Sequence, residues 1–273
     1  MVDRMHDDPF DRGFAADLDA LRAQRGRRAV LGLVGGGAAV AGGAVLLGGG
    51  GASAVARAAL GACAAEIPAE TGGPFPADGT NGPNVLDDEG VVRRDIRGSF
   101  AGATGRARGV PLRLVLTLQD TATCAPVSGL AVYAWHCDQL GRYSVYSDGA
   151  TEANFLRGVQ VSNDRGRLRF RTIFPGCYPG RWPHVHFEVY SSLADATGGS
   201  DPVVTSQLAF PRRQSMRVYR NDDRYVGSEA NLNRISIGTD GVFGEDDGER
   251  QLATMSGNLS DGLTARLVVP VDV

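Results

Sequence analysis

The chain contains no lysine, and all 28 of its basic residues are arginine. Together with 31 acidic residues this gives a formal net charge of -3. No basic tract with interleaved aromatic residues occurs anywhere along the sequence. Nucleic-acid-binding domains usually carry a clear basic excess of this kind. The charge pattern therefore argues against a nucleic-acid partner.

Helical periodicity is also scarce beyond residue 62, where we find no helix-period run of useful length, no internal repeat and no low-complexity segment. Short alternating segments separated by turn residues occur instead, and they predict an all-β sandwich or barrel. In residues 167–172, Leu168 and Phe170 point to one face and three arginines to the other. Residues 65–109, rich in Gly, Pro, Asp and Asn, are expected to form a long ordered arm. The predicted strands are 112–118, 129–137, 167–172, 184–190, 203–210 and 263–271.

Charge is absent from residues 29–56, which are rich in Gly, Ala, Leu and Val. The preceding stretch, GRRAVLG, resembles a twin-arginine export signal, with Arg27 and Arg28 before apolar residues. A basic region before an apolar one is the export pattern. We therefore expect a signal and linker over residues 1–62, one β domain over residues 63–273, and an exported or cell-surface protein. An uncleaved membrane anchor is the alternative, since 28 uncharged residues are long enough to span a bilayer.

Cysteines are few: Cys63, Cys124, Cys137 and Cys177. Disulfides persist in exported proteins, so one or two bridges are expected, although the sequence does not give their pairing. The stretch before Cys63 also loosely resembles a lipoprotein processing site. Lipidation of Cys63 would leave an odd number of thiols among the other cysteines, which makes it the less favoured alternative.

Histidines are equally few, yet two of the four lie two residues apart in PHVHF. On a strand, His184 and His186 share one face while Val185 and Phe187 share the other. Two imidazoles one pleat apart can bind a single metal ion. His136 is the only other histidine in the predicted domain, so further ligands are expected to be of another type, carboxylate or tyrosine.

Two longer stretches, WHCDQLGRYSVYSDG at residues 135–149 and FPGCYPGRWPHVHF at residues 174–187, resemble the intradiol ring-cleavage dioxygenases. The chain is most similar to the exported, single-domain bacterial members of that family. The resemblance runs from about Cys63 to the C-terminus, and it includes the ETGGPFPADG arm and the VVRRDIRG stretch. It implies a Greek-key β-sandwich and an oxidoreductase.

The resemblance implies a non-haem Fe(III) ion bound by Tyr143, Tyr178, His184 and His186. This donor set is chemically consistent, because phenolate oxygen is a hard ligand that suits a hard trivalent ion. Tyr146, three residues after Tyr143, is a rival ligand, although the G-x-Y-S motif favours Tyr143. In the family the position of His136 does not bind metal. A copper or zinc site would also suit His-x-His, but neither ion usually recruits paired phenolates.

The implied reaction is cleavage of a catechol-type ring between its two hydroxyl-bearing carbons, with both atoms of O₂ incorporated. By resemblance Tyr178 acts as the base, Arg181 stabilises negative charge on the substrate, and Gln207 hydrogen-bonds near the reacting oxygen. The expected partners are a small catechol, O₂ and the twin-arginine export machinery, with membrane contact only through the signal. The alternative is a non-catalytic exported β-sandwich that binds metal or carbohydrate. Substrate substituents and oligomeric state stay open.

Overall fold

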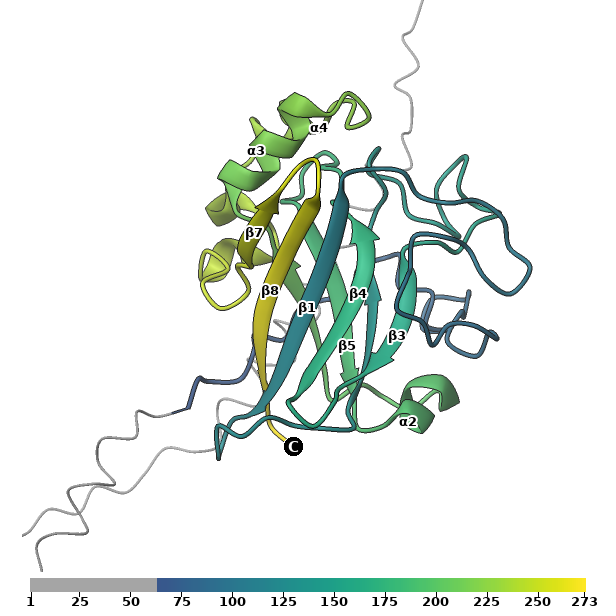
Figure 1. Cartoon of the computed structure of the whole chain (residues 1–273), viewed down its shortest axis with the longest axis vertical. Coiled ribbons are helices and arrows are strands. Elements are labelled where there is room, and N and C mark those ends of the chain that lie inside the picture. The colour runs from purple at the N-terminus through teal and green to yellow at the C-terminus, as the bar shows by residue number, and fades with distance from the viewer. Residues whose placement is uncertain (1–62) are drawn as a thin grey trace, which may run out of the picture.

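A computed structural model describes residues 63–273 as two packed β-sheets with short helices at their edges (Figure 1). The predicted export signal lies outside the described residues. The strands are β1 (Pro111–Asp120), β2 (Ala131–Trp135), β3 (Arg157–Val161), β4 (Arg167–Ile173), β5 (His184–Tyr190), β6 (Val204–Ala209), β7 (Thr254–Asn258) and β8 (Gly262–Val271). The helices are α2 (Leu193–Gly198), α3 (Arg212–Asn221) and α4 (Ser228–Leu232), with 3₁₀ turns at Ile237–Thr239 and Phe243–Glu245.

Each sheet has four strands, in the orders β4-β1-β8-β7 and β3-β2-β5-β6. β1 and β8 run parallel, and the other pairings between these strands are antiparallel. The predicted all-β sandwich is therefore confirmed, including a strand that begins at His184 and ends at Tyr190.

The core lies between the sheets and follows from the period of two along each strand. In β1 the inward residues Leu112, Leu114, Leu116 and Leu118 are buried, while their neighbours in sequence face outward. In β5 the inward residues are Val185, Phe187 and Val189. Burying a side chain of this size stabilises the fold by about 1.5–3 kcal/mol. The alternation of apolar residues along the strands therefore favours packing of the two sheets with these faces together.

The predicted arm is confirmed: no named strand or helix occurs in residues 64–109. Its backbone is held by hydrogen bonds to both sheets. Ile67 N–H donates to the carbonyl of Pro270 in β8 (2.9 Å), and Arg93 N–H donates to that of Val159 in β3 (3.0 Å). The arm therefore crosses the edges of the sandwich and reaches the outer face of the β3-β2-β5-β6 sheet.

The prediction of no useful helix was wrong, since α3 has ten residues. Its sequence is rich in arginine, and it buries only Ser215, Val218 and Tyr219, so the apolar period is too weak to recognise in the sequence. Strands β3 and β7 were missed as well, because RGVQV and TMSGN lack clear alternation. Among the described residues, no helix is both long and apolar enough to cross a membrane.

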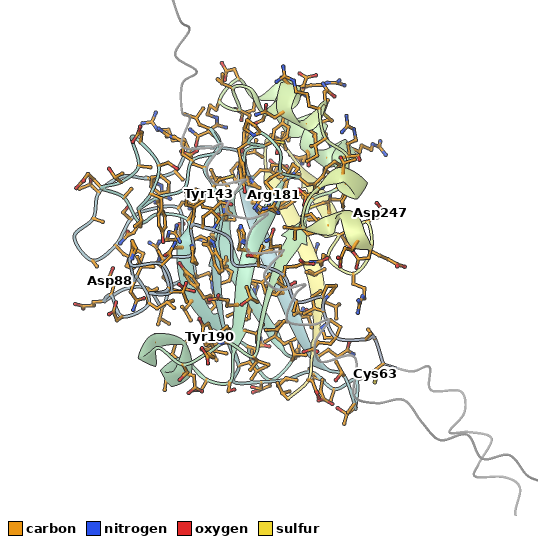
Figure 2. All side chains as sticks on the ribbon, turned by 180° about the vertical axis from the view of Figure 1, so that it is seen from behind. Cys63, Asp88, Tyr143, Arg181, Tyr190 and Asp247 are labelled. Atoms are coloured by element: carbon orange, nitrogen blue, oxygen red, sulfur yellow. A yellow bond between two sulfur atoms is a disulfide. The ribbon has the colours of Figure 1, made fainter. Side chains whose placement is uncertain are left out.

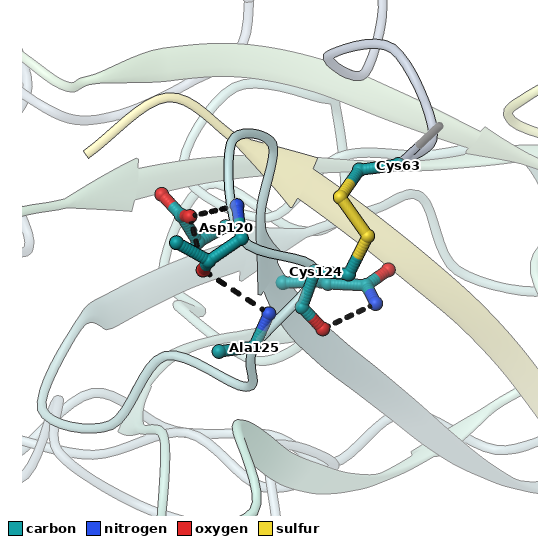
Figure 3. The surroundings of a disulfide bond; sticks show 6 residues. Cys63, Asp120, Cys124 and Ala125 are labelled. Atoms are coloured by element: carbon teal, nitrogen blue, oxygen red, sulfur yellow. Dashed lines mark hydrogen bonds between the residues drawn. A yellow bond between two sulfur atoms is a disulfide. The ribbon is translucent and has the colours of Figure 1, made fainter. Parts of the chain in front are cut away.

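A disulfide joins Cys63, at the start of the described chain, to Cys124 in the turn after β1 (Figure 3). The amide of Gln119 donates to the carbonyl of Cys124 (2.7 Å) and holds the turn. The Cys63 sulfur is thus occupied, which contradicts the lipidation alternative. Cys137 and Cys177 are buried free thiols.

Removing this bridge should lower stability measurably, because the two cysteines are 61 residues apart and the bridge restricts the unfolded chain. For a loop of that length we expect C63S/C124S to lose about 2–4 kcal/mol of unfolding free energy, measured by urea denaturation. An unchanged urea midpoint, with reductant absent throughout, would contradict a disulfide in the native protein.

Candidate metal centre

Four donor atoms from three segments converge at one point on the outer face of the β3-β2-β5-β6 sheet. His184 and His186 lie on β5, Tyr143 follows β2, and Tyr178 lies between β4 and β5. The Tyr143 hydroxyl is 3.1 Å from His184 Nε2 and 3.2 Å from His186 Nε2. The Tyr178 hydroxyl is 3.2 Å from His184 Nε2, and the two Nε2 atoms are 3.0 Å apart. All four side chains are almost fully buried.

The loop that carries Tyr143 is organised by Asp138. Its carboxylate accepts hydrogen bonds from the backbone N–H groups of Leu140 (2.8 Å) and Arg142 (3.0 Å), and from the Arg142 guanidinium (2.7 Å). Gly141 has a φ of 82°, and a Cβ there would lie 2.9 Å from Cβ of Tyr178. Glycine in the G-x-Y-S motif therefore allows the two tyrosine loops to approach each other.

Both histidines are buried imidazoles that favour the neutral form, in which one ring nitrogen has a free lone pair. Nδ1 of His184 lies 2.5 Å from the carbonyl oxygen of Trp182. A carbonyl only accepts, so Nδ1 carries the proton and Nε2 presents its lone pair. Burial, aided by the charge of Arg181, lowers the pKa of His184 to about 3. Burial and the neighbouring His184 likewise lower the pKa of His186.

Trp135 fixes the second imidazole by stacking, with ring centroids 4.9 Å apart and an interplanar angle of 8°. His186 Nδ1 and Trp135 Nε1 are buried without a hydrogen-bond partner among the described residues. Because no acceptor fixes the His186 tautomer, the stacked indole and the strand itself hold this ring in place.

The phenols have the opposite electrostatic preference. Burial and the adjacent Tyr178 raise the pKa of Tyr143 well above its ordinary value. A buried phenol ionises only when a cation offsets the cost of burying its charge. The two tyrosine hydroxyls beside two neutral imidazoles therefore form a donor set that suits a cation.

The spacing fits one metal ion. With bonds of about 2.1 Å, adjacent ligands at right angles lie about 3 Å apart, which is the separation of the paired donor atoms here. Among the described residues no group of three or more His, Cys, Asp or Glu could hold a metal. A metal site at this point therefore depends on the tyrosines.

The rival residues are all engaged elsewhere. The Tyr146 hydroxyl accepts from Ala77 N–H (2.9 Å) and donates to Asn81 Oδ1 (2.7 Å). His136 Nε2 contacts Thr172 Oγ1 (2.6 Å), and its burial lowers its pKa to about 4. The thiol of Cys177 contacts the carbonyl of Arg181. These three residues serve packing and loop structure.

Arg181 is fully buried close to Tyr143, near one end of the sheet (Figure 2). One guanidinium nitrogen donates to Gln207 Oε1 (2.7 Å), and Nε pairs with Asp240 Oδ2 (3.1 Å). Gln207 is also completely buried, and its amide donates to the Thr71 carbonyl of the arm (2.9 Å). Gln207 thus links the Arg181 guanidinium to the arm through its two amide hydrogen bonds.

Asp240 was missed in the sequence, where TDG reads as an ordinary turn. The Oδ2 atom of Asp240 also accepts a hydrogen bond from the backbone N–H of Trp182 (2.6 Å). Its Oδ1 atom accepts hydrogen bonds from the backbone N–H groups of Val242 and Phe243. Burial opposes ionisation, yet Arg181 and these backbone groups hold the pKa of Asp240 below its ordinary value. Asp240 therefore neutralises Arg181 and ties the segment before Phe243–Glu245 to the site.

Arg157 of β3 was missed too, and it fixes the arm over the site. Its guanidinium donates to the carbonyls of Phe75 (2.8 Å), Pro76 (2.6 Å) and Ser144 (3.0 Å). The ring of Phe75 then stacks on Tyr143, with centroids 4.9 Å apart. One buried cation thus joins the arm to the loop that carries a predicted ligand.

The fold and this site can now be compared with known proteins. A family model described as Dioxygenase (Dioxygenase_C) matches residues 97–216, which include all four predicted ligands. An intradiol ring-cleavage dioxygenase from Tetranychus urticae is 27% identical, with a TM-score of 0.55, covering 67% of this chain and 88% of that one. The structure of the dioxygenase Tetur07g02040 is 25% identical, with a TM-score of 0.60, covering 77% and 95%.

Among curated proteins, 6-chlorohydroxyquinol 1,2-dioxygenase of Cupriavidus pinatubonensis is 31% identical over 123 residues. The match spans 38% of this chain and 38% of that relative, well under half of either. The matched family model and these relatives are dioxygenases, and the two solved structures resemble this chain in fold. The chain is therefore similar to the intradiol ring-cleavage dioxygenases, and the family model covers residues 97–216, less than half of its length.

Replacing Asp240 should destabilise the protein strongly, because Asp240→Asn leaves Arg181 buried without its counter-charge. Breaking a buried ion pair from one side costs about 3–5 kcal/mol, so urea unfolding should show a loss of that order. Glu229→Gln is the control, since Glu229 pairs with Arg220 on the exposed surface. A loss for Asp240→Asn no larger than the control's would contradict the pairing.

Glu70 in the arm should make stability depend on pH. Burial, with smaller contributions from Asp246 and Glu245, raises the pKa of Glu70 to about 7 against the opposing effect of Gln251. Between about pH 4.5 and 7 the unfolded chain therefore holds fewer protons at this residue than the native chain, and native stability falls as pH rises.

Glu70→Gln removes this penalty. The variant should gain about 1–2 kcal/mol over the wild type at pH 8, a value discounted for partial exposure, and gain nothing at pH 4. Urea midpoints at both pH values measure the difference, with Glu66→Gln on the same arm as the charge-matched control. A gain that is the same at both pH values would show that the carboxyl does not titrate in this way.

Proposed function

We propose that this protein is a non-haem Fe(III) dioxygenase that cleaves a catechol-type ring between its two hydroxyl-bearing carbons. The observation that carries the proposal is the convergence of Tyr143, Tyr178, His184 and His186, with neighbouring donor atoms 3.0–3.2 Å apart. The names of the relatives support the reaction class, since they are intradiol or hydroxyquinol 1,2-dioxygenases.

Fe(III) is the ion that this donor set favours. Two-histidine sites completed by a carboxylate suit Fe(II), whereas zinc and copper sites usually take imidazole, thiolate or carboxylate ligands. Two phenolates and two neutral imidazoles around a trivalent ion leave a net charge of +1, which is a modest charge for a buried site. Bound Fe(III) would supply a Lewis-acidic centre that chelates the diol and activates the ring toward O₂.

Tyr178 has the role of a proton carrier. A catechol must lose its hydroxyl protons to chelate a metal as a dianion, and a phenolate ligand has a basicity close to that needed to accept one. The Tyr178 hydroxyl lies 3.2 Å from His184 Nε2, and this proximity supports a role beside a diol bound to the ion. Its loop begins after Gly176 and continues into the exposed Pro179-Gly180 pair.

Arg181 supplies fixed positive charge to the same place. Its guanidinium is held by Gln207 and Asp240 before any substrate arrives, so no reorganisation is needed when negative charge develops on the ring. The pairing with Asp240 also makes burial of the arginine possible. Gln207 in turn is fixed by the arm through the Thr71 carbonyl.

Export is proposed on separate grounds. The twin-arginine-like GRRAVLG stretch predicts translocation by the twin-arginine machinery to the cell surface or beyond. A disulfide between Cys63 and Cys124 supports this proposal, since disulfides persist in oxidising compartments. Export would place the enzyme where it can act on catechols outside the cell.

The test is the visible spectrum of the full-length, iron-loaded protein, followed by oxygen uptake with catechol. Phenolate bound to Fe(III) gives a red charge-transfer band that shifts when catechol is added under nitrogen. Tyr143→Phe should displace or abolish the band, and Tyr178→Phe should in addition lower turnover by about 10²- to 10⁴-fold, the usual contribution of a proton-transfer group. Tyr146→Phe is the matched control and should keep both band and turnover.

A colourless iron-loaded protein, or a band lost equally in Tyr146→Phe, would overturn the ligand assignment. A coloured protein that shows neither a shift nor oxygen uptake would favour the non-catalytic binding module. Full turnover by Tyr178→Phe would leave the metal centre in place and remove the proton-carrier role.

A further inference from the structure

The outer face of the β4-β1-β8-β7 sheet carries a patch of exposed arginines. Arg167, Arg169 and Arg171 project from β4, Arg113 from β1 and Arg266 from β8. We call these five residues the basic face. It lies on the opposite side of the sandwich from the metal centre, which is on the outer face of the other sheet. No helix or loop of the described chain crosses β8 and β1 in Figure 1.

The basic face lacks counter-charges. None of the outward positions in its four strands is a carboxylate. Within the described chain Arg113, Arg167, Arg169 and Arg171 have no ion pair or side-chain hydrogen bond, while Arg266 donates to Ser256 Oγ (2.8 Å). Asp95 lies opposite Arg171 in an isolated bridge beside β4, where its carboxylate is bound by Arg97. Asp120 at the end of β1 is bound by Thr123, and Asp261 between β7 and β8 by Asn258.

The clustering of these arginines lowers the stability of the sheet. Arg113 and Arg171 are directly opposite each other in the antiparallel pair, and like charges in that position are destabilising. The whole chain carries a net charge of -3, so the clustering is local and does not follow from an overall basic composition. An anionic ligand lying across the strands would remove the repulsion.

A cavity lies at one end of the basic face. Its volume is about 330 Å³, within the range of small-molecule sites. Arg97, Arg113 and Arg171 contribute to its lining, as do Thr264 and, at the hairpin between β7 and β8, Asp261. The cavity therefore presents the guanidinium groups of Arg113 and Arg171 and the hydroxyl of Thr264 to a ligand, while Arg97 is paired with Asp95. The rest of the basic face extends from the cavity along the strands.

The residues between the arginines indicate which polyanion fits. They are small and mostly polar, with Thr117, Thr264, Thr254 and Ser256 as hydroxyl donors and Val115 and Val268 as the apolar residues. Single-stranded nucleic acid usually requires aromatic side chains for base stacking. Membrane surfaces usually require large apolar or aromatic side chains that insert among the lipids. The basic face has neither.

We propose that the basic face binds an acidic polysaccharide of the polyuronate type, with one sugar ring in the cavity. Guanidinium groups pair with carboxylates in bidentate fashion, and the intervening threonine and serine hydroxyls suit sugar hydroxyls. Arginines two residues apart on a strand are separated by about 6.7 Å, and neighbouring strands by about 4.8 Å, so the face offers repeated contacts to a chain with regularly spaced carboxylates. Binding would hold the protein on an anionic matrix while the metal centre stays accessible.

The test measures binding of the full-length protein to polygalacturonate by titration calorimetry at several salt concentrations. The triple variant R113Q/R169Q/R171Q should bind at least tenfold more weakly than the wild type, with a shallower dependence of affinity on salt. The control R213Q/R220Q/R234Q removes the same charge from exposed arginines outside the basic face and should bind as the wild type does. R113K/R169K/R171K should lie between the two, since it keeps the charge and loses the bidentate geometry.

Equal binding by the two glutamine variants would overturn the proposal. So would tighter binding of the wild type to duplex DNA, or to vesicles of phosphatidylcholine and phosphatidylserine, than to polygalacturonate. Thermal unfolding of each variant in parallel establishes that the change in affinity is not a change in folding. The basic face takes no part in the metal centre, so every variant should turn over a small catechol at the wild-type rate. The binding test does not use turnover, and a failure of the proposed activity would leave its result unchanged.

Discussion

The structure depends on one strand that is buried on both faces. β5 places Val185, Phe187 and Val189 in the core between the sheets, and its other side chains lie beneath the arm. Water is therefore excluded from the imidazoles by the same packing that stabilises the sandwich. A shift of one residue in the pairing of β5 with β2 would exchange the two sets of side chains, so the core fixes the position of both histidines.

Two buried arginines provide the second constraint, because they hold loops and the arm against the sheet. The groups that stabilise the two buried charges differ. Arg181 is balanced by a carboxylate and an amide, whereas Arg157 is surrounded by backbone carbonyls and hydroxyls. Each joins the arm or a loop to the sheet that carries the site. Guanidinium groups thus add to the backbone hydrogen bonds that order the irregular segments, because their several donors can reach more than one segment at once.

Much of the site could be predicted because its signals are local. The period of a strand is enough to predict that the two histidines of the His-x-His pair share one face. The two tyrosines are identified by the resemblance of the short G-x-Y-S and Tyr-Pro motifs to those of the family. Asp240 and Arg157 could not be predicted, because their partners lie 59 and about 80 residues away in sequence and no local pattern marks them. Strands β3 and β7 were missed for a related reason: their formation depends on neighbours that complete the sheets. Helix α3 is held by packing of a few residues against the core.

The parallel pairing of β1 with β8 has a consequence for biosynthesis. β1 lies between β4 and β8 in its sheet, and β8 follows all other strands of the described residues in sequence. While the chain emerges from the ribosome, one edge of β1 keeps its backbone donors and acceptors unpaired until the final strand arrives. Contacts between such distant segments form slowly, so the β4-β1-β8-β7 sheet can close only after β8 has been synthesised.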